Sequence, residues 1–177
     1  MKALALLIAP IALLAASCSA DLRPYSTTVH RQANLGPDVL QQIQFYVSDD
    51  IVLHRQLRGT ETSVSGGVLR TVNGREVEEV RIPSGTPGLV VGMEGTVLLV
   101  SFDSDGSYLR FGPNQGAGGK YTLMAADWDG RNGKVAYGGS DYQAVGTSHY
   151  AHLLLDMERM ERVTIATKEA SGRTLSP

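Results

Sequence analysis

Two short acidic motifs are the first residues in this sequence that could do chemistry. Residues 103–106 and 127–130 both have the form Asp-x-Asp-Gly, and carboxylate oxygens are the ligands that calcium prefers. An EF-hand loop needs a glutamate at its twelfth position, whereas these motifs have Asn114 and Gly138 there. Aspartate and glycine are also typical of hairpin turns. We therefore expect turns at both motifs and no bound metal ion.

Two further patterns match ligand sites only in part. His149 and His152 are three residues apart in an expected strand, so their rings would point to opposite faces and could not share one ion. The glycine-rich residues 112–121 have Asn114 and Tyr121 where a phosphate-binding P-loop needs Gly and then Ser or Thr. We expect a loop between strands at this place, and no cofactor.

Nucleophilic catalysis has little support among the motifs. The chain contains no Gly-x-Ser-x-Gly elbow, and its only cysteine, Cys18, lies near the N-terminus. A Ser-His-Asp triad is defined by geometry, which a sequence does not supply. The chain is therefore not expected to be an enzyme. A periplasmic hydrolase remains the alternative from another functional class.

Four aromatic residues form the candidate binding surface. Trp128 lies in an expected turn between two aspartates, and Tyr137, Tyr142 and Tyr150 lie on or beside late strands. Aromatic rings with polar groups are enriched at binding surfaces. Tyrosines at strand ends also pack against cores, and the sequence leaves both interpretations open. The expected partner is a protein of the cell envelope, with a glycan such as peptidoglycan as the alternative.

The N-terminal segment ends in the only cysteine of the chain. Lys2 precedes an apolar stretch over residues 3–14, and small residues stand directly before Cys18. This arrangement resembles the signal of bacterial lipoproteins, which implies cleavage after residue 17 and a lipid anchor on Cys18. Ser19 in place of Asp implies the outer membrane, facing the periplasm. An ordinary secretory signal is the alternative; the apolar run is shorter than the about 20 residues of a membrane-spanning helix.

Composition indicates one exported domain. Removal of the first 17 of 177 residues leaves 160, which is enough for one hydrophobic core. A single cysteine excludes an internal disulfide. The formal net charge of −2 becomes more negative when Lys2 is removed, so no basic patch argues for a nucleic-acid partner. The 20 glycines indicate many turns between short strands.

The chain divides into a signal over residues 1–17, a tether over 18–38 and a domain over 39–177. The tether is expected to be flexible because it lacks periodicity and contains the breakers Pro24 and Gly36. A proline suits the first turn of a helix, so one short helix is expected at 37–42.

Residues 39–177 alternate apolar and polar side chains between short turns, which predicts a single all-β domain. The pair Asn73-Gly74 predicts a hairpin with a type I′ turn. A single helical turn is expected at 156–161. The charged residues of the 62–82 hairpin are expected to protect a sheet edge, which would place the partner elsewhere; they are Glu76, Glu78, Glu79, Arg75 and Arg81. The expected strands are 43–47, 51–55, 68–72, 75–82, 89–93, 96–102, 107–111, 121–126, 134–137, 150–155 and 162–168.

The five strands from about residue 82 to 145 resemble the SH3-like barrel family. The resemblance depends on residues 88–91, 97–102 and 108–112. Over 43–175 the chain also resembles small uncharacterised lipoproteins of Gram-negative bacteria. The residues that carry this second resemblance are 82–88, 108–112 and 135–142. It implies a family but no activity. The predicted fold is therefore an antiparallel meander, built as an SH3-like barrel or as a small β-sandwich with extra hairpins.

Overall fold

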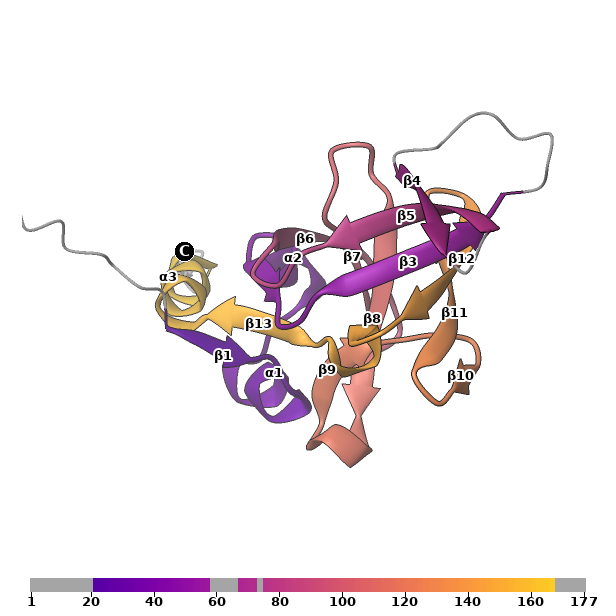
Figure 1. Ribbon diagram of the computed structural model, residues 1–177. Coiled ribbons are helices and arrows are strands. Elements are labelled where there is room, and N and C mark those ends of the chain that lie inside the picture. The colour runs from indigo at the N-terminus through magenta and orange to yellow at the C-terminus, as the bar shows by residue number, and fades with distance from the viewer. Residues whose placement is uncertain (1–20, 58–66, 73–74, 168–177) are drawn as a thin grey trace, which may run out of the picture.

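The computed structural model describes residues 21–57, 67–72 and 75–167 (Figure 1). Strands account for 52% of the structure and helices for 19%, which confirms the all-β prediction. The strands form two antiparallel sheets that are not closed, so the chain is a sandwich-like fold rather than a barrel.

The first sheet has seven strands within the described ranges and contains most of the predicted meander. Its order is β1 (Leu22–Pro24), β13 (Leu153–Asp156), β2 (Gln44–Val47), β6 (Pro87–Glu94), β7 (Val97–Ser101), β8 (Tyr108–Asn114) and β9 (Lys120–Leu123). Strands β6 to β9 follow one another along the chain and across the sheet. The glycine-rich residues between β8 and β9 form a short connection that contains a 3₁₀ turn, η1 (Gln115–Ala117).

The second sheet has six described strands. Its order is β10 (Trp128–Asp129), β11 (Asn132–Tyr137), β12 (Ser140–Val145), β3 (Ile51–Gln56), β5 (Arg75–Ile82) and β4 (Val68–Val72). Val72 pairs with Arg75, so the predicted hairpin is present, although Asn73 and Gly74 lie outside the described residues. The fifth strand of the expected meander, β11, belongs to this second sheet and not to the first.

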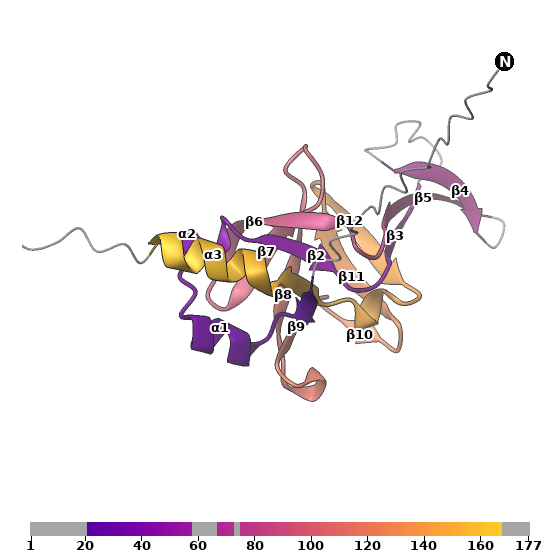
Figure 2. The same cartoon turned by 90° about the vertical axis from the view of Figure 1, so that its left-hand side faces the viewer.

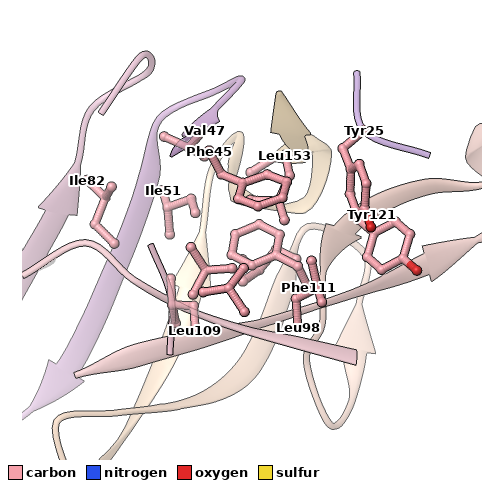
Figure 3. Close-up of a cluster of buried hydrophobic side chains, with 14 of the residues drawn as sticks. Tyr25, Phe45, Val47, Ile51, Ile82, Leu98, Leu109, Phe111, Tyr121 and Leu153 are labelled. Carbon is pink, nitrogen blue, oxygen red and sulfur yellow. The ribbon is translucent and has the colours of Figure 1, made fainter. Parts of the chain in front are cut away.

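The core lies between the inner faces of the two sheets (Figure 3). Alternate residues of the central strands are buried, as in Phe45 and Val47 of β2 and Ile51 and Leu53 of β3, whereas β1, β4 and β10 have no buried residue. Each such side chain stabilises the fold by about 1.5–3 kcal/mol relative to its exposed state. A chain without an internal disulfide depends on this burial for its stability.

Residues 21–38 of the predicted tether are ordered, which corrects that expectation. Residues 22–24 form β1, and the ring of Tyr25 is fully buried, 5.2 Å from Phe45 and 4.5 Å from Tyr121 between ring centres. Helix α1 (Thr27–Ala33) follows, with Ser26 as its N-cap, and α2 (Pro37–Leu40) is the predicted short helix. The sequence did not predict this order, because a three-residue strand and a single buried tyrosine are too short to produce a hydrophobic periodicity. Residues 18–20 lie outside the described residues.

The C-terminal segment is a helix where a turn and a strand were predicted. Helix α3 (Met157–Thr167) begins directly after β13, and the Asp156 carboxylate accepts hydrogen bonds from the N–H groups of Glu158 (3.1 Å) and Arg159 (3.2 Å). Met160 is buried in the core. The period-two alternation of residues 162–168 was misleading. Apolar residues spaced three and four positions apart, as on one face of a helix, fit the same stretch of sequence. Residue 168 lies outside the described residues.

The two ends of the molecule are formed by different elements. Strand β1 and helices α1 and α3 lie at one end, whereas β4 and β10 lie at the other (Figures 1 and 2). Within the described ranges, no helix is long and apolar enough to cross a membrane.

Candidate functional site

The only tryptophan of the chain lies on a short edge hairpin. Trp128 begins β10, which pairs with β11 through Trp128–Gly133 and Asp129–Asn132. Gly130 closes the turn with a φ of +60°, so this Asp-x-Asp-Gly motif is a hairpin turn as predicted. A Cβ atom at Gly133 would lie 2.6 Å from the indole Cε3, so only glycine allows the ring to pack on β11. The indole nevertheless remains 38% exposed.

A second segment brings two more rings to the same place. The 3₁₀ turn η2 (Ser148–Tyr150) follows β12, and Ser148 is fully buried. Its hydroxyl accepts a hydrogen bond from the N–H of Val52 (2.9 Å) and donates to the carbonyl of Val145 (2.6 Å). This buried serine fixes η2 to the second sheet. The neighbouring Tyr150 is 58% exposed.

Trp128, His149 and Tyr150 form one continuous group of rings, which we call the aromatic cluster. The centres of the Trp128 and His149 rings are 6.3 Å apart at 64°, and those of His149 and Tyr150 are 3.7 Å apart at 41°. His149 Nδ1 lies 2.9 Å from the carbonyl oxygen of Gly146, which orients the imidazole. The sequence identified Trp128 and Tyr150 but missed His149. His149 and Tyr150 are adjacent and stack because they lie in a 3₁₀ turn. A segment expected to be a strand gives no indication of such stacking.

Tyr137 and Tyr142 do not belong to this surface, which corrects their prediction as binding residues. Tyr137 is 6% exposed and Tyr142 is 3% exposed, and their ring centres are 6.3 Å apart inside the sandwich. The Tyr137 hydroxyl donates to the Asp103 carboxylate. Burial raises the pKa of Tyr137, and the hydrogen bond to Asp103 adds to this effect. Both tyrosines therefore serve the core, which was the packing interpretation left open by the sequence.

A buried ion pair lies beside Tyr142. Glu78 is fully buried on the inner face of β5 and accepts hydrogen bonds from Arg55 Nη2 (2.7 Å) and Nε (2.9 Å). The Arg55 guanidinium also lies 5.9 Å from the centre of the Tyr142 ring. Burial, followed by the charge of Glu78, raises the pKa of Tyr142. Every charge in this group already has a partner, and the group contributes to structure.

The expectation that charges on β5 protect a sheet edge is wrong. Strand β5 lies between β3 and β4, so it is not an edge strand. Glu78 is buried, and Glu79 binds His54 (2.9 Å) and Arg70 (2.8 Å). Among the described strands, the edge next to β5 is β4, where Val68 is 64% exposed.

One serine, one aspartate and one histidine meet among the described residues. The Ser48 hydroxyl lies 2.6 Å from Asp49 Oδ2 and 2.8 Å from His152 Nδ1, and it also accepts from the N–H of His152 (2.9 Å). In a hydrolytic triad the carboxylate binds the imidazole nitrogen that does not face the serine. Here the carboxylate binds the serine, and the hydroxyl connects two strands. This geometry supports a structural role for Ser48.

The side chains of the other candidate ligand motifs are hydrogen-bonded to groups within the domain. Asp105 accepts hydrogen bonds from the Ser107 N–H (2.8 Å) and hydroxyl (2.9 Å), which lower the pKa of its carboxyl group and close the turn before β8. His149 and His152 have separate partners. The described part of the chain holds no group of three or more His, Cys, Asp or Glu residues arranged to bind a metal ion. Cys18, the predicted lipidation site, lies outside the described residues.

Comparison with known proteins adds no relative. No family model, no curated protein and no solved structure matches the chain. The function of this chain is therefore inferred from its residues and their geometry.

Proposed function

We propose that this protein is a lipid-anchored binding module of the bacterial cell envelope, which contacts a partner protein through the aromatic cluster. The observation that supports this function best is that Trp128 and Tyr150 are exposed and are brought together by His149. Large apolar rings that remain exposed and contiguous are typical of interaction sites. Tryptophan and tyrosine are also the residues that most often dominate binding energy at protein interfaces.

The rigid support of the two exposed rings favours recognition of a partner. Trp128 is held on a hairpin that requires Gly133, and Tyr150 follows a turn that the buried Ser148 fixes. Rings held in place before binding lose little conformational entropy when a partner docks. The proposed anchor at Cys18 would keep the module and a partner on the same membrane, where the effective concentration is high. We place the module on the outer membrane, facing the periplasm, on the basis of Ser19 after the anchor.

Photocrosslinking in living cells tests this proposal. A photoreactive residue at Trp128 or Tyr150 should give the same discrete protein adduct, because both positions belong to one cluster. Asp38 is the matched control, since it is exposed on α2, which lies away from β10 (Figure 1). Absence of an adduct at both aromatic positions, or the same adduct from Asp38, would contradict the proposal.

A glycan is the second candidate ligand. Asp129 and Asn132 are exposed and paired in the turn next to Trp128, so hydrogen-bonding groups stand beside a flat ring. Trp128 is the only tryptophan, so its fluorescence reports on the cluster directly. Saturable quenching or a shift with soluble peptidoglycan fragments, lost in Tyr150→Ala, would favour the glycan. No change with fragments, together with a protein adduct, would favour the protein partner.

A further inference from the structure

The folded domain starts four residues after the proposed anchor. Strand β1 begins at Leu22, and Tyr25 is already buried in the core. Consecutive Cα atoms are about 3.8 Å apart, so the Cα atom of Leu22 lies at most about 15 Å from that of Cys18. If Cys18 carries acyl chains, as the proposed function requires, this end of the domain is held at the membrane surface. The tether expected from the sequence would have allowed a much larger distance.

Two helices surround this point of attachment. Leu22 pairs with Asp156, the residue that caps α3, and α1 begins at Thr27. An apolar groove of about 380 Å³ lies between the two helices. The apolar residues that line it are Val29, Ala33, Met157 and Met160, and Gln32, Glu161 and Thr164 complete its rim.

We propose that the groove between α1 and α3 docks on the lipid surface of the membrane that carries Cys18. The short connection leaves little room for a protein between this end and the bilayer. Val29 and Met157 are only partly buried although they pack against the core, so both helices leave apolar surface at this end. Apolar helix faces bind the boundary between headgroups and acyl chains, and flexible methionine side chains adapt to such irregular surroundings.

Docking in this way would orient the whole molecule. Strand β10, which carries Trp128, lies at the opposite end of the molecule from α1 and α3 (Figures 1 and 2). The end with the helices would face the lipid, and β10 with Trp128 would lie at the end away from it. One end would then hold the membrane while the other remains free for a partner.

Fluorescence quenching in vesicles tests the orientation on the full-length, acylated protein. Cys18 is the only cysteine and would be blocked by acylation, so a cysteine introduced at Gln32 or Asn132 can be labelled selectively. Gln32 lines the groove and Asn132 lies on the β10–β11 hairpin. In vesicles of phosphatidylethanolamine and phosphatidylglycerol with a quencher on the lipid headgroup, we expect several-fold stronger quenching at Gln32. Equal quenching at the two positions would overturn the docking proposal.

A matched pair of variants separates the groove from the anchor. Val29→Glu places a charge in the groove, whereas Thr28→Glu places the same charge on an exposed position of α1. With both proteins folded by circular dichroism, Val29→Glu should reduce quenching of the Gln32 label and Thr28→Glu should not. Both should still float with vesicles through Cys18. A protein that does not float would contradict the anchor and the proposed function, whereas floating without preferential quenching would contradict only the docking.

Discussion

Individual tyrosines in this protein have different roles because they lie on different faces of the strands. Tyr137 and Tyr142 occupy positions that face the core, and burial raises the pKa of both phenols. Tyr150 lies in a turn and is exposed. Residue type alone did not separate these roles, since any of the three could have been a packing or a binding residue.

Alkaline pH should reveal the buried tyrosines. In the unfolded chain the Tyr137 phenol loses its proton near pH 10. In the folded chain its pKa is raised, so it keeps this proton at higher pH. The corresponding stability is complete below that pH and is lost as pH rises, by up to about 1.4 kcal/mol per pH unit for each such group. Tyr137→Phe should therefore make the loss of stability between about pH 9 and about pH 11 less steep. Urea unfolding at several pH values measures this slope.

The exposed Tyr150 supplies the control for that experiment. Tyr150→Phe removes a phenol that is accessible to solvent in the folded chain, so the alkaline slope should change little. Tyr25, Tyr121 and Tyr142, whose pKa values are also raised, remain in the Tyr137→Phe variant. The slope should thus decrease without disappearing. An unchanged slope would show that the phenol of Tyr137 is not protected.

The ion pair between Arg55 and Glu78 predicts an asymmetric mutational effect. Arg55→Met leaves the fully buried Glu78 without its main partner, so the free energy of unfolding should fall by about 3–5 kcal/mol. Replacing both residues with methionine removes the uncompensated charge and should restore most of the loss. Urea denaturation of the two variants measures the difference. A single variant as stable as the unmodified protein would contradict the structural role of the pair.

Among the elements, the turns were easier to predict than the terminal segments. The hairpins at Gly95, Gly106 and Gly130 each have a glycine with positive φ, which the local sequence indicates directly. Strand β1 and helix α3 depend on distant contacts. Strand β1 exists because it pairs with β13, about 130 residues later in the chain.

Replacement of Tyr25 tests whether the N-terminal element belongs to the domain. Tyr25→Ala removes a fully buried ring that contacts Phe45 and Tyr121, so the free energy of unfolding should fall by about 3–5 kcal/mol. Thr28→Ala, at an exposed position of α1, is the control and should change stability by no more than about 0.5 kcal/mol. Thermal or urea unfolding measures both. Wild-type stability of Tyr25→Ala would restore the interpretation of this segment as a tether.

At the scale of the whole molecule, the proposed anchor and the folded domain should be separable. Cys18 precedes β1, so Cys18→Ser should move the protein from the membrane fraction to the soluble fraction without changing its melting temperature. Ser19→Ala, which keeps the cysteine, should remain with the membrane. Cell fractionation followed by circular dichroism measures both properties. Retention of Cys18→Ser in the membrane fraction would contradict lipid anchoring.

The sequence by itself determined the fold class, the positions of most strands and the exposure of Trp128, because turn residues and period-two alternation act over a few neighbouring residues. Only the tertiary structure decided that Tyr25 joins the core, that Glu78 is buried, and that Tyr137 and Tyr142 face inward. The contact between Trp128 and His149 likewise joins segments about 20 residues apart. Such contacts depend on strand register and on which face each sheet buries, and a pattern of single residues contains neither.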